Sequence, residues 1–372
     1  MARATTGTRR AQNASATMPE RRAIVRDFTR GGRPYEVIFD TRTAYDFLIS
    51  LEIGDADDRD LAPEDHAWLK QARAGLSAEQ LAAVSECFGD ESMPVFHGLA
   101  DTLVDRPEIR DAASVVEAIE RSGTRGVTRA MLVDNLQEAV PDDVIDRAID
   151  GDAAAIAELQ PSLHEYHRAD FQKFLANADA NVNRLMGALR AWLPLFQQVE
   201  ARVADLQARD VAWRSDDRAT LDDGALIEKV TGGLRWLPDA QVNRVILSPS
   251  YFSRPFNYVY QGTSWRLFCY PMADAVLEQV DSGTPPPSVV RLYRALGDST
   301  RMRTLKLLSE RDWYLTELAT QLELSKPTMK HHLALMRAAG LVTVTEEGTL
   351  TYYSLRRERL EEAGLELRRF IG

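Results

Sequence analysis

Apolar residues recur every three or four positions through most of the chain between Thr43 and about Leu234. Six segments there combine this helical spacing with residues that favour helix caps, and the longest runs from Phe171 to Asp210. The segments begin with TAYDF, SAEQL, VVEAI, RAMLV, DVIDR and FQKFL. We therefore expect this region to be largely helical, and we find no sequence repeat in it.

Three shorter segments carry the pattern of strands instead. In PYEVIFD, residues 34–40, apolar and polar positions alternate and place Tyr35, Val37 and Phe39 on one face. Residues 242–250 and 264–272 are rich in β-branched and aromatic residues and are flanked by Pro, Ser and Gly. These segments predict a small sheet within the helical region.

Three consecutive prolines in DSGTPPPS, residues 281–288, can neither continue a helix nor donate to a sheet ladder. We place a domain boundary there. We expect residues 1–33 to form a disordered basic arm. Residues 34–285 would form a helical domain with a small sheet that binds an effector or a partner, and residues 286–372 a terminal module. The fold class is mostly α, or α+β.

After the prolines come four helical patterns, two strand patterns and a last helix. The helices begin SVVRL, DSTRM, LTELA and SKPTM, the strands are LVTVTE and TLTYYSL, and the last helix starts at Arg356. This order of elements predicts a winged helix-turn-helix.

The fourth helix, from Ser325, divides into two faces. At about 100° per residue, Met329, Leu333 and Met336 share the side that packs on the preceding helices. Ser325 is a good N-cap, and the polar side remains available for the major groove of DNA, with lysines toward phosphates and Thr328 and His331 toward base edges. His332 lies beside the apolar face, where we expect it to orient the helix. A solvated cationic face is the plainer alternative.

Charge supports the DNA interpretation. The chain has a net charge of −11, but residues 286–372 carry +3, the arm +6 and residues 34–285 −20. The chain holds only six lysines, and Lys326 and Lys330 are two of them. This distribution indicates that the ends of the chain, rather than its middle, face a polyanion.

Residues 290–354 resemble the ArsR/SmtB-type winged-helix repressors, through ALGDSTRMRTLKLL, LTELATQLELSKPTMKHHL, AAGLV and YYSL. The resemblance implies a bacterial homodimer that represses by occupying double-stranded operator DNA, with the first and last helices of the module packing across a two-fold axis. An apolar stripe on the last helix agrees with this. Its residues are Leu360, Ala363, Leu367 and Phe370 or Ile371.

Two departures from the family pattern change the expected site. LTELATQL has no thiol and residues 355–372 have no histidine, so we expect no metal switch and no cofactor. The wing turn carries Glu346 and Glu347, which repel phosphate, so nearby arginines or the arm would have to replace wing contacts. The candidate DNA-binding residues are Ser325, Lys326, Thr328, Lys330, His331, Arg337, Arg356 and Arg357.

Aromatic residues concentrate between residues 251 and 270. They could line an apolar pocket for a small-molecule effector, or they could simply form the core of the sheet. The candidate pocket residues are Trp192, Phe196, Trp236, Tyr251, Phe256, Tyr258, Tyr260 and Trp265.

Other motifs favour ordinary structural roles. His164, His167 and Asp170 have helical spacing but no HExxH pattern, so we interpret them as surface residues rather than metal ligands. TGGLRW, residues 231–236, predicts a turn rather than a nucleotide site. Cys87 and Cys269 are expected to be buried apolar residues.

No run of about 18 apolar residues could span a membrane, and no secretory signal is evident, which favours a cytoplasmic protein. The sequence thus predicts a DNA-binding transcription regulator that is not an enzyme. The alternatives are a protein-interaction adaptor that uses the winged helix to dock a protein partner, and an enzyme fused to a DNA-binding module. No enzyme signature supports the latter.

Overall fold

The computed structural model of the protein describes residues 35–53, 60–89, 99–134, 136, 140–163, 168–237, 241–262, 264–277, 285–347 and 350–372. The predicted arm lies outside these ranges, so its disorder stays a prediction. From Pro34 to Gly372 the chain forms one compact unit. Within this unit, residues 35–277 are called the body and residues 285–372 the module. The predicted boundary between them also stays a prediction, since residues 278–284 are not described.

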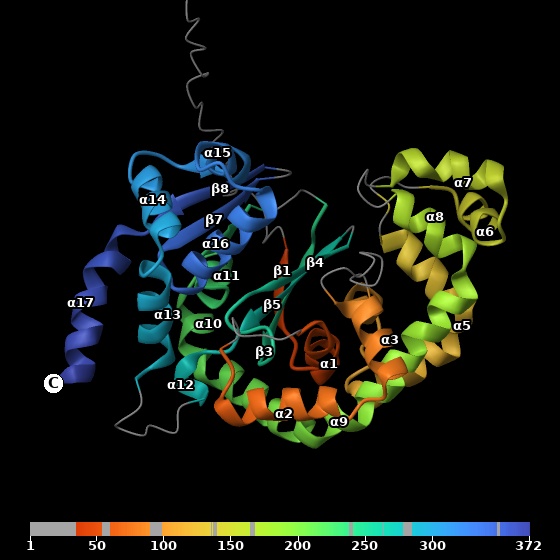
Figure 1. Cartoon of the computed structure of the whole chain (residues 1–372), viewed down its shortest axis with the longest axis horizontal. Helices are drawn as coiled ribbons and strands as arrows, with labels where there is room; N and C mark the ends of the chain where they lie inside the picture. Colours follow the sequence, from red (N-terminus) through yellow and green to blue (C-terminus); the bar gives the residue numbers. More distant parts are fainter. Residues whose placement is uncertain are drawn as a thin grey trace, which may run out of the picture. The chain divides into compact units, whose positions relative to one another are not determined.

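The body is mostly helical, as expected, and holds a small sheet (Figure 1). Its helices are α1 Thr43–Glu52, α2 Pro63–Ala74, α3 Ala78–Phe88, α4 Asp101–Val104, α5 Ala112–Asp134, α6 Asp142–Ile149, α7 Ala153–Leu159, α8 Arg168–Ala176, α9 Ala178–Trp213, α10 Ser215–Thr220, α11 Asp223–Val230 and α12 Asp274–Leu277, with a 3-10 turn at Gln160–Ser162. Its strands are β1 Glu36–Phe39, β2 Leu234–Trp236, β3 Arg244–Ser250, β4 Tyr258–Gln261 and β5 Trp265–Pro271.

The body sheet has the strand order β1-β3-β5-β4. Strands β1, β3 and β5 are parallel, and β4 pairs antiparallel with β5 at the edge. The three predicted strand segments are therefore confirmed, and β4 is an additional strand. Parallel strands need long crossovers, and the chain between β1 and β3 supplies one that contains α1 to α11.

Side chains of the sheet alternate between two apolar cores. Ile246 and Cys269 point into the core formed with the helices that include α1 and α9. Val245 and Phe268, one residue earlier on each strand, point into a second core that the body shares with the module. Tyr35 is buried in this second core, and Val37 and Phe39 pack against it, which confirms the predicted face of β1.

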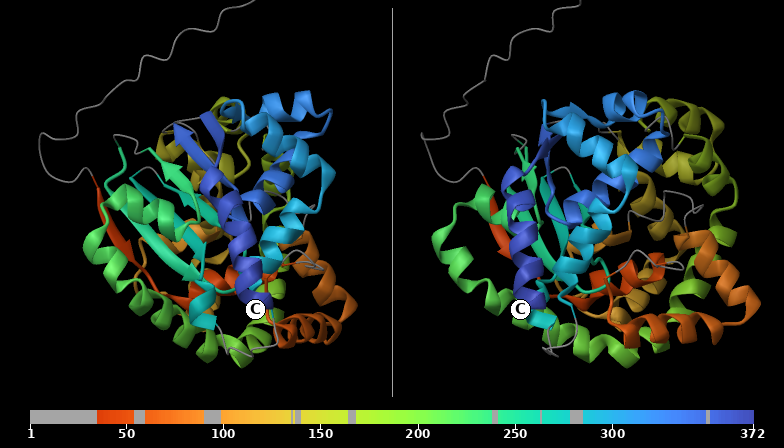
Figure 2. Two further views of the ribbon diagram at one scale, coloured as in Figure 1. Left: turned by 90° about the vertical axis from the view of Figure 1, so that its left-hand side faces the viewer. Right: turned by 60° about the vertical axis from the view of Figure 1, so that its left-hand side comes forward.

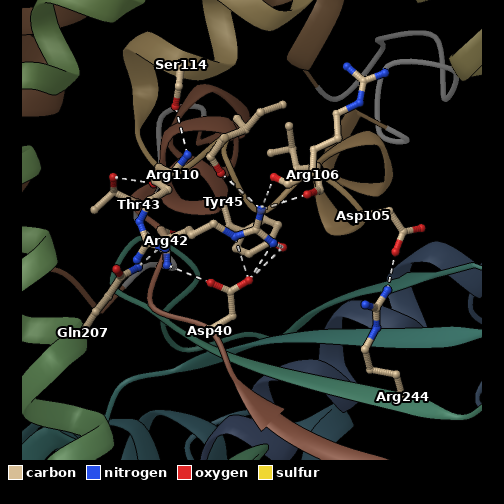
Figure 3. A network of polar contacts seen from close by, with 12 residues as sticks. Asp40, Arg42, Thr43, Tyr45, Asp105, Arg106, Arg110, Ser114, Gln207 and Arg244 are labelled. Carbon is tan, nitrogen blue, oxygen red and sulfur yellow. Dashed lines mark hydrogen bonds and ion pairs between the residues drawn. The ribbon is translucent and has the colours of Figure 1, made fainter.

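A buried arginine fixes the start of α1. Arg42 Nη1 donates to the carbonyl oxygen of Leu103 in α4 at 2.8 Å, and to that of Ile109, in the connection from α4 to α5, at 3.1 Å (Figure 3). Its Nε donates to Asp40 Oδ2 at 2.8 Å, and Nη2 donates to the Tyr45 hydroxyl. One guanidinium thus satisfies carbonyl groups that would otherwise be buried without partners, and it joins β1 to the helices.

The long helix expected from Phe171 to Asp210 is divided. Asn177, with φ −135° and ψ 35°, separates α8 from α9. The Asn181 side chain donates to Phe174 O at 3.2 Å, so it satisfies a carbonyl at the end of α8. The apolar spacing continues across the break, which is why the pattern did not show it.

The module has the predicted helices and wing strands in the predicted order, with one additional short strand between its second and third helices. Figure 1 shows its helices around the wing strands. These elements are α13 Pro287–Leu296, α14 Ser299–Leu308, β6 Trp313–Tyr314, α15 Leu315–Gln321, α16 Lys326–Ala338, β7 Val342–Glu347, β8 Leu350–Leu355 and α17 Arg357–Ile371. The mostly α (α+β) fold with a C-terminal winged helix-turn-helix is confirmed.

The body contributes a strand to the wing. Strand β2 pairs parallel with β7, in a sheet of order β2-β7-β8-β6 (Figure 2). Residues 231–233 of TGGLRW form the predicted turn, whereas residues 234–236 form β2, which the sequence did not predict. Gly233 has φ +108°, and a Cβ there would lie 3.3 Å from Thr343 Cγ2, so glycine permits both the backbone angle and the close approach to β7. The wing edge is therefore covered by the body.

Both cysteines are buried, as expected, and burial raises the pKa of the Cys87 thiol to about 12. None of the described helices is both long enough and apolar enough to span a membrane.

Candidate nucleic-acid interface

The turn from α15 to α16 positions the candidate DNA-binding helix. Glu323 adopts a left-handed conformation with φ 57°, and Leu324 N donates to Ala319 O at 2.9 Å, so the chain reverses tightly. Leu318 of α15 and Met329 of α16 are fully buried. Their packing fixes the angle at which α16 leaves the module.

Ser325 caps α16 as the sequence predicts. Its hydroxyl accepts a hydrogen bond from Thr328 N at 3.2 Å and lies 2.7 Å from Thr328 Oγ1. Pro327 occupies the second helical position, where no intrahelical hydrogen bond is lost. The first turn therefore presents backbone N–H groups and the positive end of the helix dipole to the solvent.

The two faces of α16 are those expected. Met329, Leu333 and Met336 are at most 1% exposed and belong to the core shared with the body. The polar residues at the N-terminal end of α16 are exposed on the surface of the described part of the chain. These exposed residues are Ser325, Lys326, Thr328, Lys330 and His331.

His332 lies between α16 and the start of α14. Its Nδ1 is 4.0 Å from Asp298 Oδ1, and Asp298 caps α14 by accepting from Arg301 N at 2.9 Å. Burial lowers the pKa of His332, and the nearby Asp298 opposes that shift only in part. The half-buried position of His332 between α14 and α16 supports its predicted role in orienting α16.

The remaining predicted arginines occupy three different settings. Arg337 is half-buried near the end of α16, while Arg356 and Arg357 are exposed after the wing. Arg357 Nη2 donates to Ser309 O at 2.6 Å, so part of its guanidinium already has an acceptor. Residues 348–349 at the wing turn and the side chains of the two glutamates before them are not described, so the acidic wing stays a prediction.

Sequence reasoning missed a group of arginines beside α16. Arg291 and Arg294 on α13 and Arg301 on α14 line a cavity together with His331 and Leu335 of α16. In the sequence they resemble ordinary solvated charges on amphipathic helices. Only the packing of α13 and α14 against α16 shows that they converge.

The predicted aromatic pocket residues are core residues divided between two faces. Trp192, Phe196, Tyr251, Tyr260 and Trp265 belong to the core on the α9 side of the sheet. Trp236 belongs to the opposite core, where its ring lies 5.4 Å from that of Tyr35. Phe256 and Tyr258 are half-buried. The effector pocket stays a prediction, and these contacts favour the core interpretation.

Apolar side chains remain uncovered on the outer helices of the module. Tyr293 of α13 donates its hydroxyl to Ala363 O of α17 at 3.2 Å, which holds the two helices together. Phe370 is 36% exposed and Ile371 is 72% exposed. The pair of helices thus presents an apolar surface that the described part of the chain leaves exposed.

His164 and His167 lie outside the described residues. Within the described ranges, no group of three His, Cys, Asp or Glu side chains is placed to hold a metal ion.

Residues 298–344 match the family described as bacterial regulatory protein, arsR family. The chain is 36% identical over 74 residues to the HTH-type transcriptional regulator KmtR of Mycobacterium tuberculosis and spans 57% of that protein's length. It is 35% identical over 72 residues to an uncharacterised HTH-type transcriptional regulator of Methanocaldococcus jannaschii, and 31% identical over 72 residues to the transcriptional repressor SdpR of Bacillus subtilis. These matches span 81% and 80% of the two proteins.

Each of these matches covers about a fifth of the present chain. They concern its winged helix-turn-helix. In this module Ser325 caps α16, and the polar side of α16 is exposed. On this segment the chain belongs to the ArsR family of bacterial helix-turn-helix transcription regulators.

Proposed function

We propose that the protein is a dimeric transcription regulator, acting as a repressor, whose module binds operator DNA under the control of the body. The observation that carries the proposal is the polar N-terminal half of α16, which is exposed along its whole outer side. A protein that binds bacterial operator DNA acts in the cytoplasm, so we expect this protein there.

The chemistry of α16 suits a duplex. Lys326 and Lys330 stand at the positive end of the helix dipole, where both attract phosphate groups. Thr328 and His331 carry short groups that can donate to and accept from base edges in the major groove. The charge of the module, +3 against −20 in residues 34–285, favours an approach of DNA from this side.

The uncovered apolar surface of α13 and α17 supports a homodimer. Two copies related by a two-fold axis would bury it and hold two α16 helices at a fixed separation. A separation near one duplex turn, about 34 Å, would place them in successive major grooves on one side of the DNA.

Control by the body has a structural basis in the shared core and in β2. A change in the position of β3 or β5 reaches the module through Val245, Leu247 and Phe268, which pack in the same core as α16. An effector can act through this route only if its affinity differs between two arrangements of the body and the module.

Fluorescence anisotropy tests DNA binding directly, with a duplex that the protein selects from a randomised library. We expect Lys326→Ala and Lys330→Ala each to weaken binding and to reduce the slope of log K against log salt by about 1. Lys306→Ala is the matched control, because Lys306 is exposed on α14 and lies 3.6 Å from Glu310. A protein that selects no duplex, or three variants that behave identically, would favour the protein-interaction adaptor instead.

A further inference from the structure

The C-terminal end of α16 is held by a side chain of α17. Arg359, near the start of α17, donates through Nε at 3.2 Å to the carbonyl oxygen of Ala339, the residue that caps the C-terminal end of α16. Helix geometry leaves the last carbonyl groups of a helix without a partner inside the helix. A guanidinium at this position also lies at the negative end of the helix dipole. Arg359 therefore stabilises the end of α16 opposite to the one that Ser325 caps.

Two carboxylates of α17 fix the orientation of this guanidinium. Glu366 accepts from both terminal nitrogens of Arg359, at 3.0 Å from Nη2, and Glu362 accepts from Nη1 at 3.1 Å. The Arg359 side chain is 13% exposed, and that of Glu366 is 25% exposed. The two carboxylates balance the guanidinium, so the cluster joins helices rather than attracts an anion. A bidentate pair holds the planar guanidinium in one orientation, and this directs Nε toward α16.

The chain that follows α16 fits closely against Arg359. Gly340 has φ +75°, a left-handed angle that favours glycine after a helix. A Cβ on Gly340 would lie 3.3 Å from Arg359 Nε and 3.4 Å from its Cδ. The Arg359 side chain thus packs directly over Gly340. Beside it, Arg356 N donates to Leu341 O at 2.9 Å, which holds the start of α17 at the same turn.

Helix α17 also carries part of the apolar surface on which the homodimer is proposed. Leu360 is 38% exposed and Ile371 is 72% exposed. Tyr293 of α13 donates to Ala363 O at 3.2 Å, so α17 is attached both to α13 and to the end of α16. A shift of α17 on contact with a second copy would therefore reach the C-terminal end of α16.

We propose that Arg359 is a positioning residue that couples assembly through α17 to the orientation of α16, so that dimerisation and duplex binding favour each other. This inference rests on the proposed function. The N-terminal residues of α16 lie about 20 Å from the anchored end, at 1.5 Å per residue. A tilt of about 10° at the anchor would displace them by about 3 Å, which is more than a hydrogen bond to a base edge tolerates.

Spin-label distances test the anchor without DNA. Nitroxides attach selectively to Lys330→Cys on α16 and Arg368→Cys on α17, because both positions are exposed whereas Cys87 and Cys269 are buried. Labelled chains are diluted tenfold in unlabelled protein, so that each distance is measured within one chain.

We expect Arg359→Gln to broaden the distance distribution at least twofold. Arg359→Lys keeps the charge but lacks the forked donors, and it should broaden the distribution as well. Glu361→Gln, at an exposed position of the same helix, is the matched control and should leave the distribution unchanged. Circular dichroism checks that each variant folds. Distributions that keep the wild-type width in both Arg359 variants overturn the inference.

A linkage experiment distinguishes coupling from simple stabilisation. Analytical ultracentrifugation gives the Kd of the dimer with and without a saturating amount of the selected duplex. In the wild type we expect the duplex to tighten the dimer at least tenfold, and by reciprocity the dimer binds the duplex more tightly. Arg359→Gln should reduce this ratio at least threefold. A residue that only stabilises α17 would change both dissociation constants by the same factor, and an unchanged ratio would therefore contradict the coupling.

The two experiments keep this inference apart from the proposed function. If the wild type binds a duplex and Arg359→Gln alters neither the distances nor the ratio, the regulator stands and the inference is wrong. If the wild type selects no duplex, the regulator and its coupling to assembly are both rejected. The spin-label distances then still decide whether Arg359 anchors α16.

Discussion

The ion pairs of Arg291 with Asp60 and Asp274 join the module to the body. Their removal should lower the free energy of unfolding by a measurable amount. Arg291 is 17% exposed, Asp60 is 12% exposed, and Asp274 is 18% exposed. The substitution Arg291→Ala leaves both carboxylates largely out of water, with Arg254 as the remaining guanidinium near Asp274. The module then loses this charged contact with the body.

Removing one partner of a buried ion pair costs about 3 to 5 kcal/mol, and we expect about 2 to 3 kcal/mol here because the site is partly solvated and Arg254 remains. Urea denaturation followed by tryptophan fluorescence and by circular dichroism measures this loss. Arg303→Ala, an exposed arginine on α14, is the control and should change the free energy of unfolding by less than about 0.5 kcal/mol.

A double-mutant cycle with Asp60→Asn isolates the pair itself. We expect a coupling energy of about 1 to 2 kcal/mol, since the two side chains are in contact. A loss no larger than that of the control, or a coupling energy of zero, would show that these ion pairs do not hold the module to the body. The proposed route from body to α16 would then depend on the apolar core alone.

Three further predictions concern other parts of the chain. Thr328→Ala and His331→Ala should relax sequence preference by about 1 to 3 kcal/mol per contacted base, measured by anisotropy on single-base variants of the selected duplex. Burial raises the pKa of Asp46 to about 6, although Ser250, Gln207 and two backbone N–H groups donate to it. The folded state therefore favours the protonated carboxyl more than the unfolded state does. The resulting contribution to the free energy of unfolding is present below about pH 4 and is lost as the pH rises to 6. Relative to Asp46→Asn, the wild type should lose about 2 to 3 kcal/mol over that interval in urea titrations, and parallel curves would contradict this. Ile371→Glu should shift the assembly toward monomer in analytical ultracentrifugation, whereas Glu361→Gln, on an exposed part of the same helix, should not.

The module was predictable almost element by element because its signals are local. Ser325, Pro327 and the spacing of Met329, Leu333 and Met336 specify the start and the buried face of α16 within a dozen residues. The strands β1, β3 and β5 were also evident from their composition. The parallel pairing of β1 with β3 was not, because about 200 residues separate these two strands along the chain and leave no mark on a local pattern.

The missed features depend on the same long-range pairing. The sequence shows β2 only as the end of a turn, and nothing near Leu234 indicates that its partner is Val344 of the wing. Trp236 and Trp265 seemed to be neighbours in one aromatic cluster, but they lie on strands of two different sheets and in two different cores. Likewise, Arg294 and Arg301 acquire a common environment only when α13 and α14 pack beside α16.

Site-directed cleavage of DNA tests the central claim most directly, namely that the outer side of α16 enters the duplex. Cys87 and Cys269 are buried, so an iron chelate can be attached selectively to Gln321→Cys, at the exposed end of α15 just before α16. On the selected duplex, a dimer should cut at two places centred roughly 10 base pairs apart, one for each recognition helix. Cleavage no stronger than that from a chelate on Glu361→Cys of α17, or cleavage without a repeated spacing, would contradict the account.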